Sequence, residues 1–187
     1  MNLIVNVSKN WAIGIDNGFL FHISADLKFF KNHTTGKTIV MGRKTLESLP
    51  GSKPLPNRTN IVLTRNKDYN PSGVTVLNSI DELMSTTKDT DNVYVIGGES
   101  LYRELLPYCD RAYVTKVKMA VPDADAFMVN LDDAKDWQVF EESDEMEEKD
   151  LKFKFVTYER IKGTSKNRIP IIIFFYFDYF FKNQGKK

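Results

Sequence analysis

The chain contains very little cysteine and histidine and carries almost no net charge. The single cysteine, Cys109, cannot form an internal disulfide, so a reducing cytoplasm is the expected compartment. No thiol motif surrounds it, which predicts a buried small side chain rather than a nucleophile. His22 and His33 lack the spacing of metal ligands, so no metal is predicted. A net charge of +1 argues against a general surface for nucleic acid or anionic membranes.

The first residues lack the basic and apolar regions of a secretory signal, and the length suits one domain, taken as residues 1–162. Residues 163–187 differ in composition and are treated as an appendage. Their apolar run, Ile169 to Phe181, has 13 residues and includes Asp178. A bilayer crossing needs ~20 residues, so no stable membrane insertion is expected.

The appendage has three interpretations. It is an additional element packed on the domain, a peripheral contact with a membrane or partner, or an extension without function, from readthrough or a shifted frame. Its richness in Phe, Ile, Tyr, Lys and Asn is what A/T-rich codons give by chance, which favours the third interpretation.

Strand-like and helical segments alternate along the rest of the chain, as in an α/β domain with a mainly parallel sheet. The expected strands are 3–7, 38–41, 60–64, 74–77, 93–96 and 112–117. The expected helices are 25–32, 44–49, 80–86 and 100–106. Residues 137–142 and 152–160 alternate like an antiparallel pair, joined by an acidic loop, 141–150, that is expected to be merely solvated.

Asp26 is the most informative single residue. Helical spacing places it on one face with Leu27 and Phe30, and Ser24 would serve as the N-cap. The loop before the helix, residues 14–21, contains glycines and an apolar Phe-Leu-Phe stretch. A carboxylate among apolar groups under such a loop could hold a flat ring with hydrogen-bonding groups. Stabilisation of the helix start would also account for Asp26 taken alone.

Three expected strand-to-helix turns could hold an anion. The glycines at 97–98 let a ligand approach the backbone, and the first N–H groups of the next helix favour phosphate. Arg43 and Lys44 begin another helix, where cations oppose the helix dipole. Thr64 and Arg65 end a further strand. Ligands collect beyond the carboxyl ends of strands in open sheets, so these four side chains could meet around one phosphate. Each could singly be a solvated residue.

Arg58 follows the stiff segment 54–57, Pro-Leu-Pro-Asn. Its guanidinium could bind a carboxylate through two hydrogen bonds, although a solvated loop arginine is the alternative.

Taken in order, these segments resemble dihydrofolate reductase from Leu3 to about Ile161. The matching pieces are Ile13-Gly14, Asn17-Gly18, Ala25-Asp26-Leu27 with Phe29-Phe30, Val40 to Thr45, Leu55-Pro56 with Arg58, Asn60 to Thr64, Val95 to Gly98 with Tyr102, and Thr115. The resemblance implies a mainly parallel eight-stranded sheet with an antiparallel C-terminal edge and flanking helices. It implies a monomeric cytoplasmic enzyme of one-carbon metabolism that uses NADPH to reduce 7,8-dihydrofolate to 5,6,7,8-tetrahydrofolate.

The resemblance also implies roles for individual residues. Asp26 would bind the amidine edge of the pterin and promote protonation of the ring imine, and Arg58 would hold the glutamate α-carboxylate. The other positions that match the substrate pocket are Ile4, Val5, Leu27, Phe30, Leu49, Leu55, Ile96 and Thr115. The positions that match the cofactor site are Asn6, Ile13, Gly14, Asn17, Gly18, Phe19, Leu20, Gly42, Arg43, Lys44, Thr45, Leu63, Thr64, Arg65, Ile96, Gly97, Gly98, Glu99, Ser100, Leu101 and Tyr102. Residues 13–20 resemble a mobile lid over the nicotinamide.

The chain departs from the family pattern at several positions. Phe21 stands where Trp is usual and lacks an indole N–H that could hold a water molecule. Asn6 stands where a small Ala is usual, and would either crowd the pocket or add a hydrogen bond. Ser24 replaces a frequent Pro, and residues 128–129 replace a usual Phe-Pro pair. Asn6 and Phe21 bear on the turnover rate rather than on the family.

Other functions remain open from the sequence. A reductase of this fold could act on another pterin or on a ribosylamino-pyrimidine, although Arg58 beside Leu55 and Pro56 favours a folate with a glutamate tail. A folate- or nucleotide-binding module with little turnover, or a partner protein anchored by its tail, is the alternative of another class. Asp26 argues against an inactive site.

Overall fold

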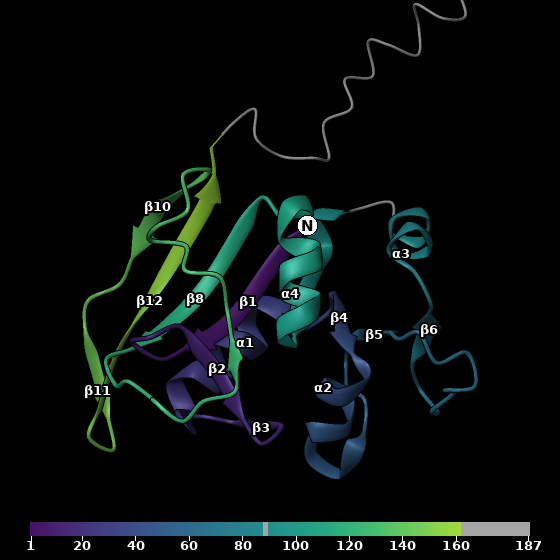
Figure 1. Cartoon of the computed structure of the whole chain (residues 1–187), viewed down its shortest axis with the longest axis horizontal. Coiled ribbons are helices and arrows are strands. Elements are labelled where there is room, and N and C mark those ends of the chain that lie inside the picture. The colour runs from purple at the N-terminus through teal and green to yellow at the C-terminus, as the bar shows by residue number, and fades with distance from the viewer. Residues whose placement is uncertain (88–89, 162–187) are drawn as a thin grey trace, which may run out of the picture.

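The alternating strands and helices assemble around one large sheet (Figure 1). The computed structural model describes residues 1–87 and 90–161. Its strands are β1 (Asn2–Val7), β2 (Ala12–Ile15), β3 (Gly18–Phe19), β4 (Thr38–Gly42), β5 (Thr59–Leu63), β6 (Thr75–Leu77), β7 (Val93–Gly97), β8 (Arg111–Val117), β9 (Ala126–Phe127), β10 (Trp137–Glu142), β11 (Met146–Glu148) and β12 (Leu151–Arg160). Its helices are α1 (Ser24–Thr34), α2 (Arg43–Ser48), α3 (Ile80–Thr86) and α4 (Glu99–Leu105), with 3₁₀ turns at Pro50–Ser52, Thr90–Asn92 and Leu106–Tyr108.

The strand order confirms the expected architecture. The path through the sheet is β10-β12-β8-β1-β7-β4-β5-β6, and β11 pairs with β12 beside this path. From β8 to β6 the neighbouring strands are parallel, whereas β12 is antiparallel to both β8 and β10. Parallel strands need long crossovers, which the alternating helices supply.

Two apolar layers cover the two faces of the sheet. On β1, Leu3, Val5 and Val7 belong to the core cluster that includes residues of α3 and α4. Ile4 points to the other face and joins the cluster that includes residues of α1 and α2. Side chains alternate between faces along a strand, so the continuous apolar sequence of β1 follows from burial on both sides.

The face covered by α1 also receives two polar side chains from the middle of the sheet. Asn6 of β1 is paired in register with Thr115 of β8, and it shares a face with Ile4. The N-terminal part of α1 therefore meets an amide and a hydroxyl where the sheet is otherwise apolar.

The predicted role of Ser24 as the N-cap of α1 is wrong. The helix begins at Ser24, and Ile23 is the N-cap residue without a side-chain capping bond. Instead, the Glu148 carboxylate accepts hydrogen bonds from the backbone N–H groups of Ser24 at 2.8 Å and Ala25 at 3.2 Å. A carboxylate at a helix N-terminus satisfies donors that lack helical partners and favours the dipole. These bonds also lower the pKa of Glu148.

The acidic loop is likewise more than solvated chain, because residues 146–148 within it form β11 against β12. A small sheet, β3-β2-β9, was also missed, since its strands are only two to four residues long.

The structure confirms the helix at 80–86, and its start, Ser79-Ile80-Asp81-Glu82, has the sequence pattern and the hydrogen bonds of a capping box. The Ser79 hydroxyl accepts from the Glu82 N–H at 3.1 Å, and the Glu82 carboxylate accepts from the Asn78 N–H at 2.7 Å. Within residues 1–87 and 90–161, no helix combines the length and apolar character needed to cross a bilayer. The appendage at 163–187, with its apolar run, lies outside the described residues.

Candidate active site

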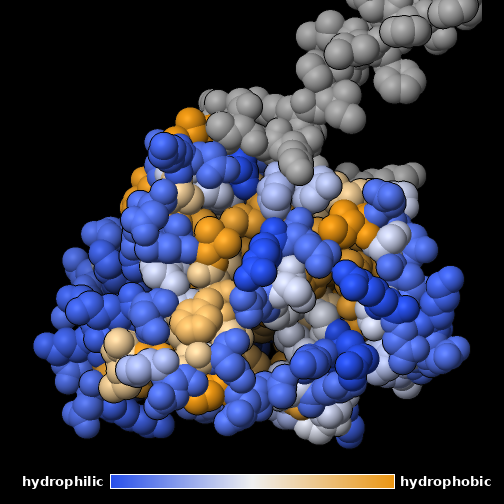
Figure 2. Space-filling model, in the orientation of Figure 1, coloured by the Kyte–Doolittle hydropathy of each residue, from blue (hydrophilic) through white to orange (hydrophobic). Residues whose placement is uncertain are grey.

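A cleft of about 1080 Å³ lies beside the carboxyl ends of the parallel strands, among residues from α1, α2, α4 and the 13–21 segment. Figure 2 shows a central hollow in this face of the molecule, with apolar residues at its rim. Single small-molecule sites usually measure about 300–1,000 Å³, so the cleft is at the upper end of that range.

The structure brings nearly all of the candidate site residues into this one cleft. Every predicted substrate and cofactor position lines it except Thr115. Thr115 is only 1% exposed and lies behind Asp26, which it contacts. Segments from 4 to 102 in the sequence therefore converge, as expected for ligands beyond the carboxyl ends of strands.

Asp26 is held by two neutral donors. The Thr115 hydroxyl donates to Oδ1 at 2.5 Å, and the Asn6 side-chain amide donates to Oδ2 at 3.0 Å. Burial raises the pKa of Asp26 above its ordinary value, and the two hydrogen bonds offset this only in part. Within the described residues Asp26 forms no ion pair, so its charge is not fixed by a protein cation.

Arg58 is oriented by its own loop. Its Nε donates to the Thr34 hydroxyl at 2.8 Å and its Nη1 to the Pro56 carbonyl at 2.7 Å, while its guanidinium lies 5.7 Å from the centre of the Phe30 ring. Partial burial lowers its pKa. Asn60 supports the loop by exchanging hydrogen bonds with the Leu55 backbone. The guanidinium has further N–H groups that could bind an anion in the cleft.

Three glycines form a close backbone corner at the other end of the cleft. A side chain at Gly42 would approach Gly98 N at 3.8 Å, and one at Gly97 would approach the Tyr102 hydroxyl and Thr45 Oγ1 at 3.5 Å each. Gly97 has a φ of +126°, which side chains rarely adopt. Gly42 and Gly98 are the N-cap residues of α2 and α4 and have no side chain that could cap the helix. The N–H groups of the first turn of each helix therefore lack a side-chain acceptor at this corner.

The predicted cationic cluster lies along the same cleft, since Arg43, Lys44, Thr64 and Arg65 all line it. Arg43 is already paired within α2: its Nη1 contacts both carboxylate oxygens of Glu47, at 2.8 and 2.9 Å. That pair is half-exposed, which leaves the guanidinium accessible to an anionic ligand.

Residues 13–20 form hydrogen bonds with Asp125, a contact that the sequence did not predict. The Asp125 carboxylate accepts from the Asp16 N–H at 3.0 Å, and the Asp125 N–H donates to the Gly14 carbonyl at 3.2 Å. β2 also pairs with β9, so residues 125–126 enter the cleft wall.

Further lining residues were not predicted: Phe21, His22, Lys31, Ser48, Pro50, Asn78, Ser79, Ile80, Glu104, Asp125 and Ala126. Residues 78–80 could have been predicted from the sequence, because their capping box follows β6, which lies parallel to β5 at the same edge of the sheet. Asp125 and Ala126 carried none, since a two-residue strand has no periodicity to detect.

Comparison with known proteins agrees with this geometry. The model of the dihydrofolate reductase family matches residues 1–160. Among curated relatives, dihydrofolate reductase of Bacillus subtilis (strain 168) is 36% identical over 168 residues, covering 89% of this chain and 97% of that protein. The enzyme of Haemophilus influenzae is 36% identical over 160 residues, covering 83% and 97%.

A solved structure, dihydrofolate reductase from Enterococcus faecalis complexed with NADP(H) and RAB-propyl, has a TM-score of 0.77 and 34% identity, and the match covers 85% of this chain and 95% of that one. Fold, ordered motifs and relatives therefore lead to one conclusion: the chain belongs to the dihydrofolate reductase family.

Proposed function

We infer that this chain is an NADPH-dependent dihydrofolate reductase, which reduces 7,8-dihydrofolate to 5,6,7,8-tetrahydrofolate. The observation that carries the inference is the Asp26 carboxylate, held by Thr115 and Asn6 in a cleft whose other end is formed by the glycine corner and the cations. Family membership and the cleft support the same reaction.

We propose that Asp26 binds the pterin through the amidine edge. Each carboxylate oxygen can accept about two hydrogen bonds, so Thr115 and Asn6 leave acceptor positions for two ligand N–H groups. Apolar side chains from both walls, including Leu27, Phe30, Leu49 and Ile96, would enclose the flat ring. Desolvation of this kind strengthens the hydrogen bonds to Asp26 and keeps bulk water from the reacting atoms.

Arg58 is the proposed partner of the glutamate α-carboxylate. It lies on the cleft wall beside Leu55, with its guanidinium held by Thr34 and Pro56 before any ligand arrives. Such prior orientation lowers the entropy cost of binding the tail. This contact favours a folate over a pterin without a glutamate.

The glycine corner and the cations fit NADPH. Backbone at Gly42, Gly97 and Gly98 can approach a pyrophosphate closely, because a side chain at these positions would fill that space. Arg43, Lys44 and Arg65 would contact the adenosine phosphates, and Ile13 to Leu20 would cover the nicotinamide. When bound, the cofactor supplies the hydride; the protein contributes alignment, shielding and the proton-relay environment around Asp26.

We also propose that the enzyme is a cytoplasmic monomer with no nucleic-acid or stable membrane partner. The free, buried Cys109 supports the compartment, and the near-zero net charge argues against a nucleic-acid or membrane surface. Light scattering of the purified protein tests the monomer.

The test is an assay of NADPH oxidation with the purified full chain. Dihydrofolate should support rapid turnover, whereas a pterin without glutamate and a ribosylamino-pyrimidine should support much less. Preference for either of these substrates would favour the other reductase function. Tight binding of NADPH and dihydrofolate without turnover would identify a binding module instead.

A further inference from the structure

Asn6 is placed where the sheet meets the reacting site. It pairs in register with Thr115 across β1 and β8, on the face covered by α1. The two side chains donate to different oxygens of Asp26, Thr115 to Oδ1 and Asn6 to Oδ2. One donor on each oxygen fixes both the position and the plane of the carboxylate. A small Ala at this place could supply no such donor.

The other end of the Asn6 amide is not used by the fold. Its Oδ1 is buried and has no hydrogen-bond partner within residues 1–87 and 90–161. A buried acceptor without a partner destabilises a protein, so an amide that served packing alone would be expected to pair both ends. The reversed amide would point Oδ1 at a carboxylate oxygen, which an ionised Asp26 disfavours. The orientation of Asn6 is therefore set by Asp26.

We propose that Asn6 is a positioning residue of this site, which orients the Asp26 carboxylate and favours its ionised form. The proposal rests on the proposed function in assigning pterin recognition to Asp26. The contact itself, however, requires no ligand.

The physical reason is the difference between the two protonation states. A hydrogen bond to a charged acceptor is roughly twice as strong as one to a neutral acceptor. The Asn6 amide therefore stabilises the carboxylate more than the carboxylic acid, opposing the effect of burial. The ionised form is the one that can accept two N–H groups from an amidine edge.

Several titratable groups lie on the elements that pack around this part of the sheet. Tyr102 of α4 is buried, donates to the Ile4 carbonyl at 2.8 Å, and has a pKa raised far above its ordinary value. Glu148 of β11 is bound to the helix start and has a lowered pKa. Tyr94 of β7 has a pKa raised to about 12 by burial and by Tyr113 of β8, to which it is close.

The cleft wall also carries ionisable or charged side chains, namely His22, Lys31, Arg43, Lys44, Arg58, Arg65, Glu99, Glu104 and Asp125. His33 of α1 lies against Phe29 of the same helix and Tyr113 of β8. Because so many other groups surround the site, the measurement must follow Asp26 itself.

The decisive experiment is a pH titration of the Asp26 carboxyl carbon by NMR, with the resonance assigned by its loss in Asp26→Asn. It uses the full chain without ligands. Asn6→Leu, which keeps the branched shape of the side chain and removes the donor, should raise the midpoint by about one pH unit. Asn6→Asp should raise it further, because two adjacent carboxylates cannot easily both ionise. If Asn6→Asp does not fold, Asn6→Ala, which also lacks the donor, takes its place as the second variant.

Asn2→Ala is the matched control, since Asn2 is a buried asparagine on the same strand whose amide donates to the Asp91 carbonyl. It should reduce stability and leave the Asp26 midpoint unchanged. A diaminopyrimidine carries an amidine edge that would pair with Asp26, so in the Asn6 variants the midpoint of the pH profile for its binding should move with the NMR midpoint, and in Asn2→Ala it should not move.

Equal Asp26 midpoints in wild type and Asn6→Leu would overturn the proposal, as would the same shift in Asn2→Ala. Failure of the dihydrofolate assay alone would overturn the proposed function and leave the titration result valid.

Discussion

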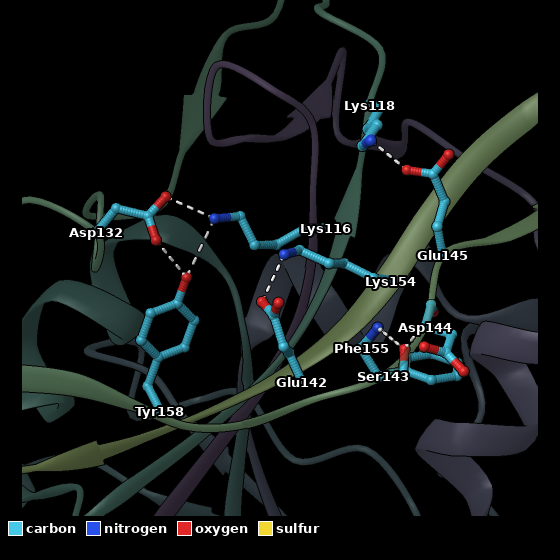
Figure 3. Close-up of polar contacts among 10 residues, drawn as sticks. All are labelled: Lys116, Lys118, Asp132, Glu142, Ser143, Asp144, Glu145, Lys154, Phe155 and Tyr158. Atoms are coloured by element: carbon cyan, nitrogen blue, oxygen red, sulfur yellow. Dashed lines mark hydrogen bonds and ion pairs between the residues drawn. The ribbon is translucent and has the colours of Figure 1, made fainter.

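Two adjacent residues of strand β8 each bind a carboxylate, one on each face of the sheet. Thr115 faces α1 and donates to Asp26, whereas Lys116 faces away and binds Asp132 at 2.5 Å. Figure 3 shows the second arrangement, in which the Tyr158 hydroxyl also donates to Asp132, at 2.6 Å. Each carboxylate accepts two side-chain hydrogen bonds. The difference is that Asp132 is paired with a lysine, whereas Asp26 is paired with no cation in the part of the chain that the structure describes.

That difference reverses the effect on the two pKa values. Burial raises the pKa of Asp26, and neutral donors offset this only in part. Burial acts in the same direction on Asp132, but hydrogen bonds from Lys116 and Tyr158 outweigh it and lower the pKa. A carboxylate fixed by a lysine remains charged and stabilises the fold. A carboxylate held by a hydroxyl and an amide can exchange a proton and bind a ligand cation, which suits a reacting site.

The largest expected effect is a loss of activity on replacing Asp26, which replacing Asp132 should not cause. Asp26→Asn should reduce kcat for dihydrofolate at pH 7 by roughly 100- to 10,000-fold, the usual contribution of a positioned acid or base. Activity should recover partly as the pH falls, because the substrate then arrives already protonated. Steady-state rates measured from pH 5 to 8 test this. A wild-type rate at pH 7 would remove Asp26 from the mechanism.

Arg58→Leu should produce the next largest effect, on binding rather than on proton transfer. Loss of a charge-assisted contact costs about 2–3 kcal/mol, which would raise KM for dihydrofolate roughly 30- to 160-fold. NADPH affinity should not change. The control substrate is a pterin without glutamate. If it suffers equally, Arg58 supports the loop through Thr34 and Pro56 and does not bind the tail.

The cations at the cofactor end should determine the preference for NADPH over NADH. Neutralising Arg43 and Arg65 should reduce the ratio of the two kcat/KM values by roughly tenfold or more, because the additional phosphate contact is ionic. High salt should weaken NADPH more than NADH. Equal use of both cofactors by the wild type would contradict the assignment.

A smaller effect is expected at the ion-paired carboxylate. Asp132→Asn should leave kcat within about twofold and reduce stability by roughly 0.5–1 kcal/mol, since the carboxylate is 43% exposed and screened by water. Urea unfolding measures the loss. Lys116→Met is the companion variant, and a comparable loss in both would identify the pair as the source. A large fall in kcat would show that this face of β8 also serves the reaction.

Truncation should have the smallest effect. We propose that residues 1–162 form the reductase domain, because every predicted site residue lies within the described residues 1–87 and 90–161. A chain ending at Lys162 should keep full activity and be more soluble, because the apolar run Ile169 to Phe181 is removed. Loss of activity, or a large fall in Tm, would show that the appendage belongs to the fold.

The sequence predicted what depends on local pattern. The helix at 80–86 follows from its capping box, and the inner strands follow from their continuous apolar runs. The ordered motifs that resemble the family predicted which segments converge on the cleft.

Long-range contacts carried no local signal. Glu148 caps α1 from more than a hundred residues away, and the Ser24 hydroxyl offered a plausible but wrong alternative. The contact of Asn6 with Asp26 depends on the pairing of β1 with β8, which neither strand reveals alone. The sequence left open whether Asn6 crowds the pocket or donates, and the structure resolves this in favour of a hydrogen bond.

The difference between the two carboxylates also sets how stability depends on pH. Asp26 has a folded-state pKa above its unfolded value, so its stabilising contribution is complete below the unfolded pKa and is lost as the pH rises through the folded one. Asp132 has a lowered pKa, so its contribution is present above the unfolded pKa and is lost as the pH falls through the folded one. Above the folded-state pKa of Asp26, that carboxylate therefore opposes folding, whereas Asp132 supports it.

The most direct test is the free energy of unfolding of wild type, Asp26→Asn and Asp132→Asn, measured together at pH 7. An asparagine at 26 removes the buried ionisable group and can still pair with the Thr115 hydroxyl and with the Asn6 amide nitrogen, which both contact Asp26. The expected result is a higher free energy of unfolding for Asp26→Asn and a lower one for Asp132→Asn. Destabilisation of both variants to the same extent would contradict the account, because Asp26 would then serve the fold as Asp132 does.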